Sequence, residues 1–406
     1  MTIFSYDCNV NKLFQKRIYL DFASITPISK KVSKETKKGE LFFANPSSLY
    51  KEGVLARKQI ERSRKKIGSF LNARAEEIFF TSGGTEGNNL AILGVFKDFK
   101  LKNKEKTPHF ITSTIEHSSV LECMRHIEKV GGVVTYIAPD RSGIIDTKAV
   151  KEALRPETVL VSIQMVNNEI GTIEPIAEIA KEIRHFKKLN SMEIFPLLHA
   201  DACQALSYIK IDTLKLHTDL LTLDSSKIYG PRGSGVLYVK KGTPISTILY
   251  GGSQEEGLRS GTENIGAILG TAKAFELVEE NRSKEFYRQV ELQKYFLHNL
   301  SIKIPEAKIN GHLIERVPGN VNFYVKGLDA EFALFELDSR GILVSTASSC
   351  VNNKEESYSY VIKEINPGAE TSSLRVSFGT TTTKRDIDKF FKVFLNTNSY
   401  KETIRR

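Results

Sequence analysis

Seven short apolar segments between residues 78 and 239 constrain the fold more than any other feature of this chain. Amphipathic stretches with helical periodicity separate most of them, and the segments are Ile78–Thr81, Phe110–Thr112, Val133–Ile137, Val159–Ile163, Phe195–Ala200, Leu220–Leu223 and Gly235–Val239. Segments that are almost continuously apolar are typical of strands buried on both faces. Their alternation with helical stretches predicts an α/β fold in which helices flank a mostly parallel sheet.

The pattern changes after Gly261. A long helical stretch precedes the strand-like pieces VNFYV, ILVST and LRVSFG and the helical pieces DAEFALFELDSRG and DIDKFFKVFL. The chain of 406 residues is also longer than one hydrophobic core usually serves. We therefore predict a large domain over residues 29–265, a small α+β domain over 266–406, and an N-terminal segment, 1–28, that packs with the small domain.

Composition and charge exclude several classes of protein. The net charge is +10, but the lysines are mostly interspersed with glutamates, which favours solvated helix faces over a nucleic-acid groove. We find no apolar run of about 18 residues that predicts a membrane span, and the N-terminus lacks a signal-peptide layout, so we expect a cytoplasmic protein. The four cysteines form no C-x-x-C pair, so neither a metal site nor a disulfide framework is predicted.

Three segments carry candidate chemistry, and the first is FTSGGTEGNNLAI, residues 80–92. Two glycines join a predicted strand to a helix. Backbone N–H groups at glycines can approach a phosphate closely, and a helix N-terminus adds a positive dipole, so Gly84 and Thr85 are candidate phosphate-binding residues. The segment fits equally well a tight turn in which Thr85 is only an N-cap.

The second segment is LLHADACQA, residues 197–205. Asp201 follows a buried strand at the edge of the sheet where α/β proteins bind ligands. Its carboxylate can pair with a protonated ring nitrogen, and Gln204 lies near enough to bind the same ligand. The alternative is an aspartate that caps a helix.

The third segment is DSSKIYGPRGSGVLYV, residues 224–239. Lys227 follows the apolar run LLTL and precedes a turn that is constrained by Tyr229-Gly230-Pro231. A lysine at the end of a buried strand can act as an amine nucleophile in Schiff-base chemistry. The alternative, a lysine on a surface loop, is the commoner situation for this residue type.

These three segments belong to a longer series whose order and spacing are highly specific. The series is YLDFASITP, NPSS, FTSGGTEGNNLAI, TSTIEHSSVL, VSIQMVNNEIGTI, HADACQA, SSKIYGPRGSGVLYV, GGSQEEGLRSGT, SSC and SSLRVSFG. It extends over nearly the whole chain and resembles the cysteine desulfurases, which are class-V aminotransferase relatives that use pyridoxal 5'-phosphate (PLP). The resemblance implies an aspartate-aminotransferase-like fold, a homodimer, and conversion of L-cysteine to L-alanine with the sulfur left on a cysteine.

The resemblance assigns the cofactor-binding residues one by one. Lys227 binds PLP covalently, Asp201 pairs with the pyridinium nitrogen, and Gln204 contacts the ring oxygen. His117, in TIEHSS, stacks on the ring and shuttles protons, a role that suits a flat group titrating near neutrality. Judged from the residues alone, a helix-capping histidine is the preferred alternative for that position. Thr262, in RSGT, reaches the phosphate bound by the partner subunit.

The resemblance also assigns the residues that handle the substrate. Arg375, in SSLRVSFG, binds the substrate carboxylate, for which a guanidinium is well suited. Asn168, in VNNEIG, lies beside the ring and that carboxylate. Cys350 is the sulfur acceptor, on a polar loop of about residues 345–360, because a thiolate nucleophile needs access. The 25 positions from Cys350 to Arg375 resemble the long-loop branch of the family.

The residues before Lys227 depart from the family pattern. Many relatives have Ser-x-His-Lys, in which the serine and the histidine both bind phosphate, whereas this chain has Asp224-Ser225-Ser226-Lys227. Ser226 can still donate a hydrogen bond to a phosphate. Asp224 is an anion where a phosphate ligand is expected, so either its carboxylate points away or it weakens PLP binding.

These observations predict a PLP-dependent cysteine desulfurase that delivers sulfur to an acceptor protein, for iron–sulfur cluster assembly or tRNA thiolation. A selenocysteine lyase, or another class-V PLP enzyme, is an alternative that depends less on Cys350, and activity on cysteine against selenocysteine separates the two. A degenerate, non-catalytic sulfur-transfer partner is a third hypothesis, supported only by the altered phosphate site. Such a protein would show no visible absorbance from lysine-bound PLP.

Overall fold

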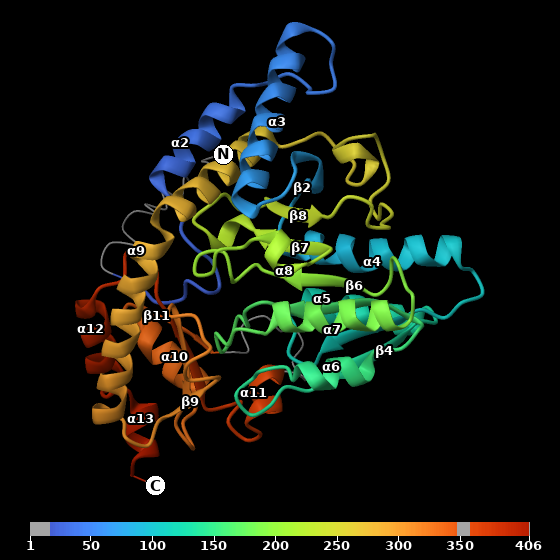
Figure 1. Cartoon of the computed structure of the whole chain (residues 1–406). Coiled ribbons are helices and arrows are strands. Elements are labelled where there is room, and N and C mark those ends of the chain that lie inside the picture. The colour runs from blue at the N-terminus through green and yellow to red at the C-terminus, as the bar shows by residue number, and fades with distance from the viewer. Residues whose placement is uncertain (1–16, 347–357, 406) are drawn as a thin grey trace, which may run out of the picture.

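A seven-stranded mixed sheet is the largest element of the computed structural model, which describes residues 17–346 and 358–405 (Figure 1). From edge to edge its strands are β2 (Ile78–Thr81), β8 (Gly235–Val239), β7 (Leu220–Asp224), β6 (Leu197–Asp201), β5 (Thr158–Gln164), β3 (His109–Ser113) and β4 (Val133–Ile137). Strand β8 runs in the opposite direction to the other six strands, which are all parallel to one another. The predicted mostly parallel sheet is therefore confirmed, strand by strand.

Both faces of this sheet are buried, which explains the continuous apolar runs. Phe110, for example, packs into the core on one face, whereas Ile111 beside it packs into the core on the other. Helices α4 (Gly84–Lys102) and α5 (Ser118–Lys129) cover the first face. The second face is covered by α3 (Lys51–Leu71), α6 (Thr147–Ala153), α7 (Ile176–Leu189) and the first part of α9 (Ile265–Lys303). Burial on both faces stabilises these strands from two sides, except for the edge strand β4, which is partly exposed.

A four-stranded antiparallel sheet forms a second, smaller core toward the C-terminus. Its strands, in order, are β12 (Ser345–Thr346), β13 (Ser373–Ser377), β10 (Asn320–Tyr324) and β9 (Lys308–Asn310). Phenylalanines from α9, α12 (Lys384–Phe394) and β10, together with Phe378 just after β13, fill this core around Phe296. The long helix α9 contributes Phe275 to the larger core and Phe296 to the smaller one, so it connects the two.

The remaining described elements are short or lie on the outside. They are β1 (Ile18–Tyr19), α2 (Lys30–Glu40), η1 (Ala75–Glu77), α8 (Thr213–Leu216), η2 (Ser225–Lys227), η3 (Glu255–Gly257), α10 (Ala330–Ser339), β11 (Ile342–Leu343), α11 (Tyr360–Ile365) and α13 (Asn398–Thr403). Strand β1 pairs with β11, and Leu20 lies in the smaller core. The domain limits predicted from the sequence stay a prediction.

Two boundaries differ from the sequence expectation. The single strand expected for ILVST is two, because β11 pairs with β1 whereas β12 pairs with β13. Strand β6 begins at Leu197 rather than Phe195, because Pro196 has no N–H to donate to a sheet. Within the described residues, no helix is both long and apolar enough to cross a bilayer.

Candidate active site

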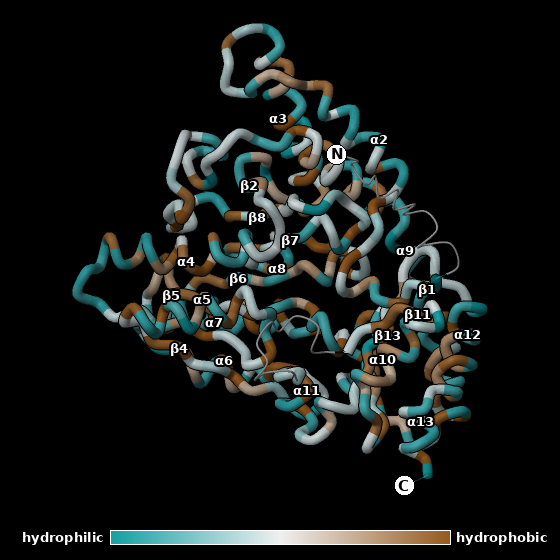
Figure 2. Tube along the Cα trace, turned by 180° about the vertical axis from the view of Figure 1, so that it is seen from behind, coloured by the Kyte–Doolittle hydropathy of each residue, from teal (hydrophilic) through white to brown (hydrophobic). Residues whose placement is uncertain are grey.

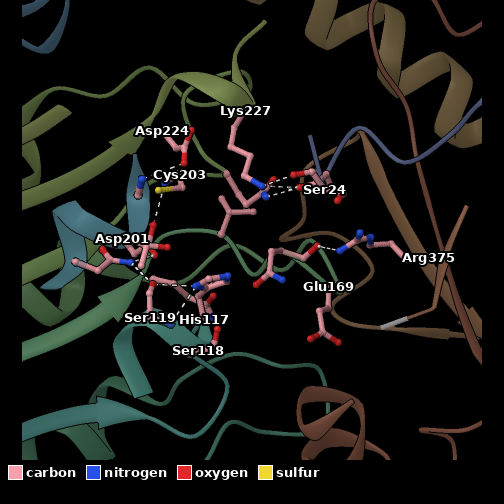
Figure 3. Close-up of a pocket in the computed structure, with 18 of the residues that line it drawn as sticks. Ser24, His117, Ser118, Ser119, Glu169, Asp201, Cys203, Asp224, Lys227 and Arg375 are labelled. Atoms are coloured by element: carbon pink, nitrogen blue, oxygen red, sulfur yellow. Dashed lines mark hydrogen bonds between the residues drawn. The ribbon is translucent and has the colours of Figure 1, made fainter. Parts of the chain in front are cut away.

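A cavity of about 220 Å³ opens at the carboxyl ends of the parallel strands, where the smaller sheet meets the larger one. Eight of the residues predicted from the sequence line it: Gly84, Thr85, His117, Asn168, Asp201, Gln204, Lys227 and Arg375. Figure 3 shows how Lys227, Asp201, His117 and Arg375 surround the same space. The structure therefore brings together residues that are up to 291 positions apart in the sequence (375 − 84).

Lys227 reaches the cavity from η2, the short turn that follows β7. Its Nζ donates hydrogen bonds to the carbonyl oxygens of Ser24 and of Ala23, the latter at 3.4 Å. The N-terminal segment that carries these carbonyls thus closes one side of the cavity. Lys227 is half-buried and lines the cavity, which favours the site lysine over the surface lysine of the alternative interpretation.

Asp201 is the last residue of β6 and does not cap an α-helix. One carboxylate oxygen accepts a hydrogen bond from the backbone N–H of Cys203 at 3.0 Å, and the other accepts one from Asn88 Nδ2 at 2.7 Å. Asn88, on α4, also donates to Ser119 Oγ at 2.9 Å. Sequence reasoning missed Asn88, which binds the Asp201 carboxylate from α4 and so holds it in place.

His117 serves as a helix cap and also lines the cavity. Its Nδ1 accepts a hydrogen bond from the N–H of Ser119 at 3.2 Å at the start of α5, and Nδ1 lies 2.8 Å from Ser119 Oγ. Burial lowers the pKa of His117, and the Asp201 carboxylate works in the opposite direction. The two interpretations drawn from the sequence are therefore compatible, since the cap fixes the ring that faces the cavity.

Arg375, on β13, is buried at the end of the cavity formed by the smaller sheet. Its guanidinium donates to Asp21 Oδ1 at 2.7 Å and to the carbonyl oxygen of Asn168 at 3.0 Å. Its Nε has no hydrogen-bond partner among the described residues. A buried cation with an unused donor beside a cavity is suited to bind a carboxylate. Asp21 was not predicted from the sequence, although it belongs to the motif YLDFASITP.

Glu169 is a second residue of the cavity that sequence reasoning missed. Its carboxylate accepts a hydrogen bond from Ser359 Oγ at 2.5 Å. Burial raises the pKa of Glu169 to about 7, whereas Arg375 works in the opposite direction. A carboxyl with such a pKa changes its charge near neutral pH, next to the guanidinium that is expected to bind the substrate.

The helix N-terminus at Gly84 has the geometry of an anion-binding site. Helix α4 begins at Gly84 with Gly83 as its N-cap, so the alternative in which Thr85 is the N-cap is wrong by two positions. Gly83 has φ of 149°, which a residue with a side chain rarely adopts. The N–H of Gly84 donates to Asp224 Oδ2 at 2.9 Å. Asp224 therefore does not point away from the cavity, which was the first of the two options left by the sequence.

Two predicted site residues are absent from the lining of this cavity, and a third lies outside the described residues. Ser226 is absent from its lining, since its N–H donates to Asp224 and its carbonyl oxygen accepts from Thr26. Thr262 lines a separate cavity with Arg259. Cys350 lies outside the described residues, as does most of its predicted loop.

The residues that are present fit PLP at its ring. The cavity offers one amine, a buried carboxylate for the pyridinium nitrogen, an imidazole and a guanidinium. Asn88 Oδ1 is also buried without a partner among the described residues. The fold and this set of side chains together define a PLP-dependent enzyme with an aspartate-aminotransferase-like fold.

Comparison with known proteins identifies the family to which the chain belongs. Residues 18–390 match the family model Aminotransferase class-V. A protein named cysteine desulfurase IscS from Dictyoglomus turgidum is 41% identical over 92% of each chain, and one of the same name from Clostridium botulinum is 39% identical over 93% of each. A solved NifS-like protein covers 93% of this chain and 98% of its own with a TM-score of 0.85 at 29% identity. Another, from Rickettsia africae, covers 96% and 100% with a TM-score of 0.81 at 30% identity. The chain belongs to the class-V aminotransferase family.

Proposed function

We propose that this chain is a PLP-dependent cysteine desulfurase that converts L-cysteine to L-alanine and leaves the sulfur on Cys350 as a persulfide. The observation that carries the proposal is the arrangement of Lys227, Asp201 and Arg375 around one cavity. The relatives named cysteine desulfurase, matched over more than nine-tenths of the chain, support it. Equimolar alanine and sulfide, formed from L-cysteine in the presence of a thiol reductant, test the proposal, with selenocysteine as the comparison substrate.

The atoms of the proposed reaction balance without an added oxidant. The thiolate of Cys350 attacks the sulfur of the substrate, so that an S–S bond forms and the Cβ–S bond breaks. The electron pair of that bond remains with the carbon skeleton, which takes up protons and leaves as alanine. One cysteine and one thiol thus become one alanine and one persulfide. The transferred sulfur is oxidised while the substrate carbon is reduced.

The side chains around the cavity have different roles in the proposed reaction. When bound, PLP supplies an electron sink for the bonding pair released at the substrate's α-carbon. Lys227 Nζ is the amine that binds the cofactor and then removes the α-proton. Asp201, held by Asn88, is the carboxylate that would pair with the ring nitrogen of the cofactor and favour its protonated form. His117, which burial favours in its neutral form, is suited to accept the thiol proton of the substrate.

The described cysteines are poor candidates for the sulfur acceptor. Burial raises the pKa of Cys123 to about 12, and burial together with Asp201 raises the pKa of Cys203 well above its ordinary value. A thiol of that kind carries little thiolate at neutral pH. This supports the assignment of the acceptor role to Cys350, which the sequence predicts to lie on a polar, accessible loop.

Arg375 is the residue we expect to bind the substrate carboxylate. Replacing it with lysine removes the planar pair of donors, and loss of one hydrogen bond to a charged group costs about 1.5–3 kcal/mol. We expect Arg375→Lys to raise KM for L-cysteine about tenfold or more, measured by alanine formation. Arg340→Lys, on the surface beside Glu336, is the control. An unchanged KM in a folded Arg375→Lys protein contradicts the role.

We also propose a homodimer, with the connection between α2 and α3 in its interface. This connection projects from the molecule in both backbone views and carries Leu41, Phe43 and Leu49 with exposed fractions of 77%, 84% and 90% (Figures 1 and 2). Adjacent exposed apolar side chains of this size are typical of an interface. A second copy is the occupant we propose, because Thr262, which the family places at the partner's phosphate, lies outside the cavity of its own chain.

The dimer is tested by Phe43→Asp. A charge in the centre of an apolar interface makes the free energy of association less favourable by as much as loss of a hot-spot residue does. We therefore expect the dimer Kd, measured by sedimentation velocity, to rise about tenfold or more. Leu189→Asp is the matched control, since Leu189 is also 70% exposed but ends α7. A wild-type protein that sediments as a monomer, or a Phe43→Asp protein whose dimer Kd equals that of the wild type, contradicts the interface.

The residues of the cavity do not identify the protein that receives the sulfur or the cellular compartment in which the enzyme works. We propose an acceptor protein of iron–sulfur cluster assembly or of tRNA thiolation, because a persulfide on an accessible loop is chemically ready for transfer to another thiol. Transfer of labelled sulfur from the persulfide to purified candidate acceptors tests this. The cytoplasmic location expected from the sequence stays a prediction.

A further inference from the structure

Asp224 uses both oxygens of its carboxylate to bind backbone amides at the wall of the cavity. It is the last residue of β7, and its Oδ1 accepts a hydrogen bond from the N–H of Ser226 at 2.7 Å. Its Oδ2 accepts one from the N–H of Gly84 at 2.9 Å. Asp224 lines the same cavity as Lys227, Gly84 and Asp201, and Figure 3 shows its carboxylate beside Cys203.

These two amides are the kind of donors that bind a phosphate. Gly84 is the first residue of α4, a helix of 19 residues, and its N–H points out of the positive end of the helix dipole. Glu86, the acidic residue in the first turn of α4, is paired with Arg259 at 2.8 Å and accepts a hydrogen bond from the N–H of Ser82. The hydrogen bonds of Asp224 come from uncharged amides, and no salt bridge to its carboxylate is found within the described part of the chain.

The surroundings hold the Asp224 carboxylate close to the helix. A Cβ atom built on Gly83 would lie 3.3 Å from Asp224 Oδ2, so glycine at position 83 is what allows this approach. A Cβ built on Gly84 would lie 2.7 Å from Cys203 Sγ. The carboxylate, the sulfur and the two glycines are thus packed together at the end of the cavity opposite Arg375. An anionic group of a ligand that reached this end would meet a fixed anion.

We propose that Asp224 competes with the 5'-phosphate of PLP for the amide of Gly84, so that this chain binds PLP weakly and discriminates little between PLP and pyridoxal. The inference rests on the proposed function, because it requires that a pyridoxal ring binds beside Lys227. Asp224 then lowers the preference of the site for the phosphorylated form of the cofactor. Its carboxylate accepts the hydrogen bonds from backbone amides that a phosphate would otherwise accept.

The test measures the Kd of PLP and of pyridoxal for the wild-type protein and for Asp224→Asn, by titration of the absorbance of the lysine-bound form. Asparagine keeps the shape and one acceptor oxygen for the N–H of Ser226 but removes the charge. We expect Asp224→Asn to bind PLP about tenfold more tightly or better, while the Kd of pyridoxal changes less than about twofold. Asp224→Ser, with a smaller side chain that donates a hydrogen bond, is expected to change in the same direction.

Asp212→Asn is the matched control for this experiment. Asp212 also caps a helical turn through two backbone amides, those of Leu214 and Lys215, but it does not line the cavity. We expect its PLP and pyridoxal Kd values to equal those of the wild type. Thermal unfolding of each variant verifies that the fold is retained, so that a change in Kd reports on the carboxylate itself.

Two outcomes overturn the inference. In the first, PLP binds no more tightly to folded Asp224→Asn and Asp224→Ser than to the wild type, so Asp224 is a structural cap only. In the second, the wild-type protein binds PLP far more tightly than pyridoxal. Failure of the proposed function gives a different result, in which neither compound binds to any variant. Binding of PLP that appears only when the charge at position 224 is removed supports the inference.

Discussion

Replacing Lys227 with alanine removes both the visible absorbance of bound PLP and the conversion of L-cysteine to L-alanine. Lys227 is the one lysine among the described residues that line the cavity, and its Nζ lies against the carbonyls of Ala23 and Ser24. Without this amine the cofactor has no covalent attachment and the α-proton has no base. A positioned base contributes about 10²–10⁴ in rate, and we expect at least that loss in alanine formation.

Lys240→Ala is the matched control for this substitution. Lys240 also follows a strand of the large sheet, β8, but it is exposed and paired with Asp219. We expect its spectrum and activity to equal those of the wild type. A Lys227→Ala protein that keeps its absorbance and turns over cysteine contradicts the assignment. A wild-type protein without the absorbance, even with added PLP, would instead favour the non-catalytic alternative.

Replacing Cys350 with serine separates cofactor binding from sulfur transfer. The hydroxyl of serine is a far weaker nucleophile than a thiolate, so no persulfide forms on the protein. The cavity residues that bind PLP are untouched, and we therefore expect an unchanged absorbance spectrum. The measurement is persulfide content after incubation with L-cysteine, together with multiple-turnover alanine formation, which we expect to fall by about 10²-fold or more.

Cys203→Ser and Cys123→Ser are the controls for the Cys350 variant. Both thiols have pKa values raised by burial, so neither is expected to carry the sulfur. We expect both control variants to accumulate persulfide as the wild type does. If Cys350→Ser still forms the persulfide at the normal rate, or if Cys203→Ser loses it, the acceptor is a different cysteine and the account of the sulfur step is wrong.

The sequence was most informative about features that depend on local periodicity. Neighbouring residues such as Phe110 and Ile111 face opposite cores, and this pattern can be read directly from an apolar segment. The division of ILVST into β11 and β12 was not predictable in the same way. It depends on which strand lies beside each half, β1 or β13, and that is decided by contacts far along the chain.

In the candidate site, too, features that depend on local sequence were predictable, whereas contacts between distant parts of the chain were not. Lys227 and Asp201 were singled out because each follows a buried strand, whereas the cofactor role of His117 was implied only by the family resemblance. Asp21 and Arg375, which are 354 positions apart, form an ion pair that no local pattern indicates. Asn88 was missed for the same reason, since its bond to Asp201 connects α4 to β6.

Asp224 shows what the structure adds to a position that the sequence had already marked as unusual. The sequence left two options, a carboxylate that points away or one that opposes the cofactor. The hydrogen bond from Gly84 excludes the first. This hydrogen bond could not be predicted because Gly84 and Asp224 are 140 positions apart in the sequence. It joins the backbone N–H of Gly84 to the side chain of Asp224.

The position of the transferred sulfur tests the central claim most directly. The wild-type protein, loaded with PLP, is incubated with L-cysteine, alkylated, digested and mapped by mass spectrometry while alanine is quantified in the same sample. The account predicts one additional sulfur atom on the peptide that contains Cys350, in amounts equal to the alanine formed in a single turnover. Alanine that forms without this modification, or an additional sulfur on the peptide of Cys8, Cys123 or Cys203 instead, would contradict it.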